Sequence, residues 1–302
     1  MARTATSDVA ATYPSPAACL QLLKPITWFA PMWAYGCGVI SSGVPVVDRL
    51  PEIVAGILLA GPLVCGTSQA VNDWYDRHVD AINEPDRPIP SGRIPGQWGL
   101  WIAIGLTVFS AAFAATLGLW AFVAALIGLA LAWAYSAPPF RLKNNGWYGN
   151  AAVAACYEGL PWFTGAAIMM SARPDALIIV MAVLYSAGAY GIMILNDFKA
   201  IDGDRQLGVR TIPVQIGAAA AARLSCLIIA APQVAVIGIL AVYGRVGYGA
   251  IVAALLFVQL FLMRALLDDP RGRAPWFNAT GTTLYVLGML ATAIAISDLG
   301  DM

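Results

Sequence analysis

Two short segments of this chain hold eight of its seventeen acidic residues. On a helix that turns about 100° per residue, the three aspartates of the first segment fall within about 60° of one another, and an asparagine amide lies at the edge of that face. Oxygen ligands without histidine or cysteine select Mg²⁺ or a similar hard cation. The candidate metal ligands are Asn72, Asp73, Asp76, Asp80, Asp197, Asp202 and Asp204.

The second acidic segment has a looser helical pattern. If it continues as a helix, Asp197 and Asp204 share a face within about 20°, whereas Asp202 points about 140° away. Gly203 is a candidate break in that helix. The role of Asp202 therefore stays open at this point.

The two acidic segments resemble each other. Each opens with Asn-Asp and an aromatic residue, at 72–74 and 196–198, and each places another aspartate seven residues after the first. Each then reaches Arg-x-Ile-Pro, at 87–90 and 210–213. This pattern predicts an internal repeat, about residues 53–170 and 175–297. Transporters also use internal repeats, so the repeat alone does not separate an enzyme from a carrier.

The chemistry that fits two such segments is diphosphate binding. Mg²⁺ in proteins prefers one or two carboxylates together with water and phosphate oxygens. Nearby basic side chains would neutralise the remaining phosphate charge, although solvated loop charges are the alternative interpretation. We expect Asp73, Asp76, Asp80, Asp197 and Asp204 to act in catalysis, and we expect the diphosphate to be bound by Arg77, Arg141, Lys143, Lys199, Arg205 and Arg210.

The composition indicates that membrane helices position these residues. Of the 302 residues, 60% are hydrophobic and only 11% are charged. Soluble domains are typically about 45–50% apolar and about 25% charged. The net charge of zero argues against a nucleic-acid-binding protein. The chain is therefore predicted to be an all-α, polytopic membrane protein.

Hydrophobic segments of about 20 residues, the length that crosses a bilayer, predict nine membrane spans. With the N-terminus inside, fourteen of the seventeen basic residues fall on the inner side. The positive-inside rule therefore predicts a cytoplasmic N-terminus and a periplasmic C-terminus. The predicted spans are about 26–44, 53–71, 98–117, 119–137, 147–170, 175–195, 222–242, 247–267 and 279–297.

Outside the spans, residues 1–14 are polar and small, and we expect them to be disordered. Residues 15–24 fit a short interfacial helix, and residues 15–302 are expected to form one membrane domain. Glu158 is the one acid in the middle of a predicted span. An ionisable group there indicates either a functional site or a hydrogen-bonded structural residue.

The first acidic segment, NDWYDRHVD at 72–80, resembles the first signature of the UbiA-type intramembrane prenyltransferase superfamily. The resemblance covers about residues 20–300 and is closest to the chlorophyll synthase branch. Within that branch, KPITWF and DRHVD resemble the bacteriochlorophyll synthases. The segments that carry it are NDWYDRHVDAINEPDRPIPSGRIPG, KPITWFAPMWAYGCGV, YSAPPFRLKNNGW and NDFKAIDGDRQLGVRTIPV.

The resemblance implies nine transmembrane helices around a central cavity, with Mg²⁺ ions at its cytoplasmic end holding the diphosphate of an isoprenoid donor. It implies a photosynthetic bacterial inner membrane, cytoplasmic or intracytoplasmic. It also implies a reaction: the propionate of bacteriochlorophyllide is esterified with geranylgeranyl or phytyl diphosphate to give bacteriochlorophyll, and diphosphate is released. The first signature carries over without alteration. In the second, Ala200 stands where many relatives have an aspartate, so the choice among its acids stays open.

Several alternatives remain at this stage. A sibling of the same superfamily would prenylate a chlorophyllide or a quinone-type aromatic ring, and a non-enzyme would carry a pigment or lipid. The only histidine, His78, is either solvated or a ligand of the pigment's metal. A carboxylate acceptor is already ionised near neutral pH and needs no protein nucleophile. This agrees with a sequence in which we find no Ser-His-Asp or Cys-His arrangement. The prenyl chain length and the oligomeric state stay open.

Overall fold

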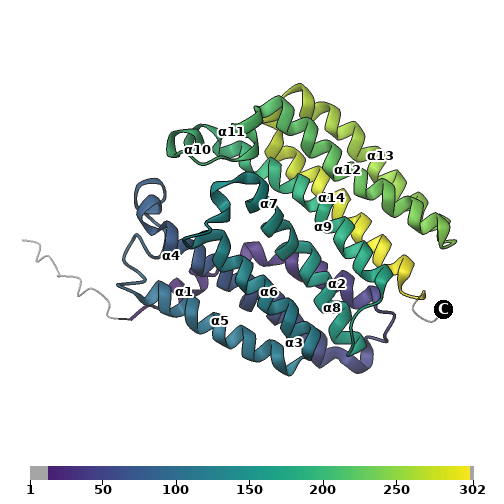
Figure 1. Ribbon diagram of the computed structural model, residues 1–302, viewed down its shortest axis with the longest axis horizontal. Helices are drawn as coiled ribbons and strands as arrows, with labels where there is room; N and C mark the ends of the chain where they lie inside the picture. The colour runs from purple at the N-terminus through teal and green to yellow at the C-terminus, as the bar shows by residue number, and fades with distance from the viewer. Residues whose placement is uncertain (1–12, 300–302) are drawn as a thin grey trace, which may run out of the picture.

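The computed structural model describes residues 13–299, and every regular element in that range is helical (Figure 1). The predicted all-α class is therefore confirmed. The expected disordered N-terminus falls, for residues 1–12, outside the described residues. A helix, α1 (Pro16–Leu22), lies where a short interfacial helix was expected. Its N-cap is Ser15, whose hydroxyl oxygen accepts a hydrogen bond from the Ala18 amide at 3.2 Å.

Within residues 13–299, seven helical segments are long and apolar enough to cross a membrane. The chain therefore has the helices of a polytopic membrane protein. Three of the segments lie within a few residues of the predicted spans 98–117, 119–137 and 247–267. The seven are Val47–Asn83, Trp98–Thr116 (α5), Leu119–Ser136 (α6), Ala176–Leu207, Ala218–Val242 (α12), Val246–Asp268 (α13) and Pro270–Ile296 (α14).

The other two predicted spans are helical but do not meet this criterion. At 26–44, a 3₁₀ turn, η1 (Pro25–Trp28), precedes a helix of only 13 residues, α2 (Phe29–Ser41). At 147–170, a π-helical turn, η5 (Ala155–Gly159), separates α7 (Gly146–Ala154) from α8 (Leu160–Met170). Length and composition thus give seven spans in the described residues, and the predicted number of nine is not confirmed.

The first acidic segment ends a long helical rod. Helix α3 (Leu50–Leu58) continues through a π-helical turn, η3 (Leu59–Cys65), into α4 (Gly66–Asn83). Pro62 lies inside the π turn, where its missing N–H removes one backbone hydrogen bond. Since α4 runs without a break past residue 80, the predicted helical face of the first acidic segment is confirmed.

The second acidic segment is not one continuous α-helix. The prediction that Asp197 and Asp204 share a helical face assumed that it was, so its premise is wrong. Helix α9 (Ala176–Asn196) gives way to a 3₁₀ turn, η6 (Asp197–Ala200), and then to two short helices, α10 (Ile201–Leu207) and α11 (Ile212–Ile216). Gly203 lies inside α10, so the break comes earlier than predicted. The start of the last span was also predicted nine residues late, because α14 opens with polar residues behind a cap by Asp269.

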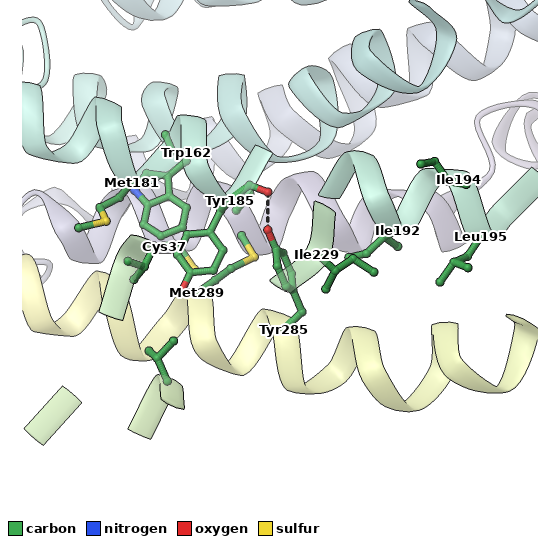
Figure 2. Close-up of a cluster of buried hydrophobic side chains, with 14 of the residues drawn as sticks. Cys37, Trp162, Met181, Tyr185, Ile192, Ile194, Leu195, Ile229, Tyr285 and Met289 are labelled. Carbon is green, nitrogen blue, oxygen red and sulfur yellow. Dashed lines mark hydrogen bonds between the residues drawn. The ribbon is translucent and has the colours of Figure 1, made fainter. Parts of the chain in front are cut away.

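Small residues and aromatic rings hold the helices together. A Cβ atom on Gly38 of α2 would lie 2.0 Å from the Trp162 carbonyl oxygen of α8, so only glycine permits this approach. Figure 2 shows Trp162, Tyr185 and Tyr285 packed between α8, α9 and α14. The Tyr285 hydroxyl donates a hydrogen bond to the Tyr185 carbonyl at 2.5 Å. This packing fixes α9, which carries the second acidic segment.

Figure 1 shows where the two acidic segments end up. The end of α4 and the short helices α10 and α11 lie toward the left of the view, while the described chain ends at the right. Segments more than 120 residues apart in the sequence therefore occupy one end of the bundle. This is the placement that a shared site needs.

Candidate active site at the mouth of a cavity

A cavity of about 500 Å³ lies between α2, α4, α6, α8 and α9. Its walls are mostly aliphatic, and its polar residues come from both acidic segments, Asn72 from the first and Asn196 and Asp197 from the second. An apolar chamber with a few convergent polar groups is the usual form of a small-molecule site. Its polar lining residues are Thr27, Ser68, Gln69, Asn72, Tyr135, Asn150, Tyr157, Thr164, Asn196 and Asp197.

Two acids of α4, Asp73 and Asp80, share one basic partner, Arg87. Asp73 is 1% exposed, and one of its carboxylate oxygens accepts from Lys24 Nζ at 2.7 Å and lies 3.3 Å from Arg87 Nη1. The same Arg87 nitrogen donates to Asp80 at 2.8 Å. The second oxygen of Asp73, Oδ2, is buried and has no hydrogen-bond partner among the described residues. A buried carboxylate oxygen without a donor is a candidate ligand atom.

The third acid of α4, Asp76, faces the connection between α6 and α7. Its carboxylate accepts from Asn72 Nδ2 at 2.9 Å and from Lys143, and Arg141 Nη2 lies 3.8 Å away. Burial lowers the pKa of the Lys143 ammonium, and the contact with Asp76 partly offsets this effect. Lys143 is therefore a desolvated cation held against Asp76, which in turn contacts Asn72 of the cavity lining. We call the end of the cavity lined by Asn72 and Asp197 its mouth.

The connection between α6 and α7 also contacts the second acidic segment. The Arg210 amide donates to the Asn144 carbonyl at 2.9 Å, and the Gly146 amide donates to the Arg210 carbonyl at 2.9 Å. Lys143, which precedes Asn144, contacts Asp76 of the first segment. One short connection thus joins both acidic segments through backbone hydrogen bonds and a side-chain ion pair.

The acids of the second segment are placed differently from one another. Asp197 accepts a hydrogen bond from Asn150 Nδ2 at 3.1 Å, and both residues line the cavity. Asp204 accepts from the Thr211 hydroxyl at 3.2 Å. Asp202 is exposed and pairs with Arg271 at 3.3 Å, outside the cavity lining. The structure therefore separates Asp202 from the other acids.

Of the six predicted diphosphate-binding residues, two contact the acids in the described hydrogen bonds and ion pairs: Arg141 and Lys143. Arg77 instead stacks on Trp74 at 4.1 Å and donates to its carbonyl. The other three side chains are exposed and, in the described part of the chain, make no hydrogen bond or ion pair with the acids. They are Lys199, Arg205 and Arg210.

Sequence reasoning missed two basic residues that do contact the acids. Lys24 stands before the first predicted span, and Arg87 opens the Arg-x-Ile-Pro sequence. The repeat showed that an Arg-x-Ile-Pro sequence, which begins with Arg87 in the first segment, follows both groups of acids. It did not show which groups the Arg87 side chain contacts. For Lys24 the sequence carries no such signal, because its contact with α4 joins residues 49 positions apart.

The residues fit a hard cation that takes most of its ligands from water and substrate. Within residues 13–299, no three His, Cys, Asp or Glu side chains form a ready cluster for a metal ion. Mg²⁺, however, commonly uses only one or two carboxylates, with phosphate oxygens and water completing its shell. The unpartnered oxygen of Asp73 and the cavity-facing Asp197 supply donors of this kind.

Two other residues singled out from the sequence lie elsewhere. Glu158 is buried in the π turn η5, does not line the cavity, and leaves its Oε2 without a partner in the described structure. His78 is exposed near the end of α4. Neither belongs to the group of side chains around the mouth.

Comparison with known proteins gives a consistent result. Residues 23–296 match the UbiA prenyltransferase family. The chain is 56% identical to the bacteriochlorophyll synthase 33 kDa chain of Cereibacter sphaeroides, with 95% of each chain covered. It is 52% identical to the protein of the same name from Rhodobacter capsulatus, with 94% of each covered. Its fold resembles that of a UbiA homolog from Archaeoglobus fulgidus bound to GPP and Mg²⁺, with a TM-score of 0.73, 21% identity, and 93% and 99% of the two chains covered.

Proposed function

The chain belongs to the UbiA prenyltransferase family, and on this premise we propose that it esterifies the propionate of bacteriochlorophyllide with geranylgeranyl or phytyl diphosphate. The products are bacteriochlorophyll and diphosphate. One structural observation carries the proposal: Asn72 and Asp197, which come from the two acidic segments, line the same cavity. The high identity to proteins named bacteriochlorophyll synthase supports this acceptor over a quinone-type ring.

In this proposal the donor lies with its diphosphate at the mouth and its prenyl chain in the cavity. The aliphatic lining suits a hydrocarbon chain, which gains free energy when it leaves water. The diphosphate needs positive charge, and two basic side chains of the connection between α6 and α7, Arg141 and Lys143, are available beside Asp76.

We propose that Mg²⁺ is held by acids of both segments. Asp73, Asp76 and Asp80 would act from α4 with Asn72, and Asp197 and Asp204 from the second segment. Asp202 is left out because it faces away toward Arg271. When bound, Mg²⁺ stabilises the negative charge that develops on the leaving diphosphate.

The chain's own residues then have three tasks. Basic side chains at the mouth stabilise the departing diphosphate. The aliphatic wall keeps water from the reacting allylic carbon, since water would convert it to an alcohol. Tyr135 and Tyr157 line the same cavity, and an aromatic face turned to that carbon stabilises its positive charge by about 0.5–2 kcal/mol.

The finer topology also belongs to this proposal. We propose that α2 and the interrupted segment α7–η5–α8 cross the bilayer with the seven longer helices, giving nine spans. The distribution of basic residues supports a cytoplasmic N-terminus and a periplasmic C-terminus. The site would then face the cytoplasm of a photosynthetic bacterium's inner membrane. Residues 15–302 would form one domain with the internal repeat described above.

An esterification assay tests the function directly. Purified protein in lipid nanodiscs receives geranylgeranyl or phytyl diphosphate with bacteriochlorophyllide, chlorophyllide or a quinone-type acceptor, and mass spectrometry identifies the product. We expect a bacteriochlorophyll ester that forms with Mg²⁺, disappears with EDTA, and returns when Mg²⁺ is restored. Ester formation that persists in EDTA would contradict the metal requirement. Prenylation of the quinone-type ring alone, or transport without covalent change, would contradict the proposed reaction.

A further inference from the structure

We propose that Gln69 and Tyr157 bind the carboxylate of the acceptor, one helical turn deeper in the cavity than the diphosphate. This inference rests on the proposed function, because it concerns the acceptor of that reaction. Both residues line the cavity, Gln69 from α4 and Tyr157 from the π turn η5. Neither takes part in the ion pairs of the acidic segments.

The depth of Gln69 matches the place where the new ester bond must form. Gln69 precedes Asn72 by three residues on α4, which is about 4.5 Å along the helix axis. The reacting prenyl carbon is bonded to an oxygen of the diphosphate, so it lies directly below the mouth. An attacking oxygen must come within about 3–3.5 Å of that carbon. The carboxylate therefore lies at the level of Gln69 rather than among the acids.

Most other polar groups below the mouth are already occupied. The hydroxyl of Thr27 donates to the Lys24 carbonyl at 2.8 Å, and that of Ser68 donates to the Cys65 carbonyl at 2.7 Å. Deeper still, the Thr164 hydroxyl donates to the carbonyl of Leu160 at 2.7 Å. These three hydrogens satisfy backbone carbonyls and are not available to a ligand.

Gln69 and Tyr157, in contrast, keep donors for a ligand. Gln69 Nε2 donates to the hydroxyl oxygen of Tyr157 at 3.3 Å. A glutamine amide has two N–H groups, and this bond uses one of them. Tyr157 acts as the acceptor in that bond and also accepts from Cys65 Sγ at 3.8 Å, so its own hydrogen is still free to point to a ligand. The pair thus presents an N–H and an O–H side by side, which matches the two oxygens of a carboxylate.

The chemistry needs such a pair. A carboxylate taken from water into an apolar chamber must find hydrogen bonds. Neutral donors supply them without placing a fixed positive charge beside the attacking oxygen. In the step itself, one carboxylate oxygen forms a bond to the prenyl carbon while that carbon's bond to the diphosphate oxygen breaks. The electron pair of the broken bond leaves with the diphosphate, and no proton transfer is required.

Comparing a free acid with its ester isolates this role. Binding of bacteriochlorophyllide and of its methyl ester is measured with Mg²⁺ and an unreactive thiolodiphosphate analogue of the donor, so that no product forms. The proteins are wild type, Gln69→Leu, Tyr157→Phe and the control Ser68→Ala, which removes a neighbouring hydroxyl that serves the backbone. Thermal melting of each variant checks folding, and binding of the donor analogue checks the mouth.

We expect wild type and Ser68→Ala to bind the free acid at least about tenfold more tightly than the ester, because hydrogen bonds to a charged group are strong. Gln69→Leu and Tyr157→Phe should each reduce this preference by about tenfold while leaving the affinity for the ester and for the donor analogue unchanged. Suppose that the wild-type protein catalyses the esterification but binds the free acid and its methyl ester equally. That result would overturn the inference without any variant. An unchanged preference in both variants would overturn it as well. A wild-type protein that forms no ester at all would instead overturn the proposed function.

Discussion

Replacing Asp197 with asparagine should reduce esterification far more than the same replacement at Asp202, although the two residues are only five positions apart. Asp197 lines the cavity and is held by Asn150 at 3.1 Å, whereas Asp202 pairs with Arg271 at the surface. The two side chains of the surface pair are 70% and 52% exposed. Such pairs contribute at most about 1 kcal/mol, and here the contribution is to stability rather than catalysis.

The expected magnitudes follow from these placements. Removing one group that stabilises charge in a water-excluded site costs about 10²–10³ in kcat, or about 2.7–4 kcal/mol. We therefore expect Asp197→Asn to lower kcat/KM at least about 100-fold. Asp202→Asn should stay within about twofold of wild type, since its loss is confined to an exposed pair.

The assay uses initial rates of ester formation in nanodiscs over a range of donor and Mg²⁺ concentrations. Thermal melting of each variant serves as the folding control. Asparagine keeps the shape of aspartate, so the contact with Asn150 survives in Asp197→Asn and both variants should melt like wild type. Equal losses of activity in the two variants would refute the reasoning. So would a nearly active Asp197→Asn.

Three further predictions follow from the contacts. Lys143→Met should raise the KM for the donor at least about tenfold, whereas Lys143→Arg keeps the charge and should change it only a few-fold; an unchanged KM in the methionine variant would contradict this. Arg87→Gln removes the cation shared by two acids of α4 and should cost about 2 kcal/mol of stability, seen as a fall in Tm of roughly 3 °C; a Tm within one degree of wild type would count against it. Gly38→Ala places a Cβ 2.0 Å from the Trp162 carbonyl oxygen and should lower stability by about 1–3 kcal/mol. Gly36→Ala on the same helix meets no atom within 4 Å and should not lower the Tm.

Hydrophobic length and helical periodicity predicted much of the fold. They are local properties, and the segments 98–117, 119–137 and 247–267 were placed to within a few residues. The errors lie where local rules compete. Helix α14 starts early because Asp269 caps it and Pro270 occupies its first position, although the first turns are polar. The π turns η3 and η5 follow no simple sequence rule, and they interrupt what hydropathy treats as uniform helices.

The candidate site was predictable in kind but not in detail. Spacing on α4 was enough to place three acids on one face, because α4 is a regular helix through residue 80. The same reasoning failed for the second segment because the α-helix changes to a 3₁₀ turn at Asp197. The partners of the acids required tertiary structure: Lys24 meets Asp73 across 49 positions, and Lys143 meets Asp76 across 67.

The balance of charge at the mouth explains why these acids and bases occur together. The four acids of α4 and its end are matched by four basic side chains within 4 Å, so the group is close to neutral.

A diphosphate adds roughly three negative charges near neutral pH. In the proposed function, one or two divalent cations would restore the balance, held by the carboxylates while the basic side chains turn to the phosphate oxygens. Without the acids, the four basic side chains would bind a diphosphate even when no metal is present. In the proposed function the acids would therefore make diphosphate binding depend on the metal. The acids concerned are Asp73, Asp76, Asp80 and Glu84, and the bases are Lys24, Arg87, Arg141 and Lys143.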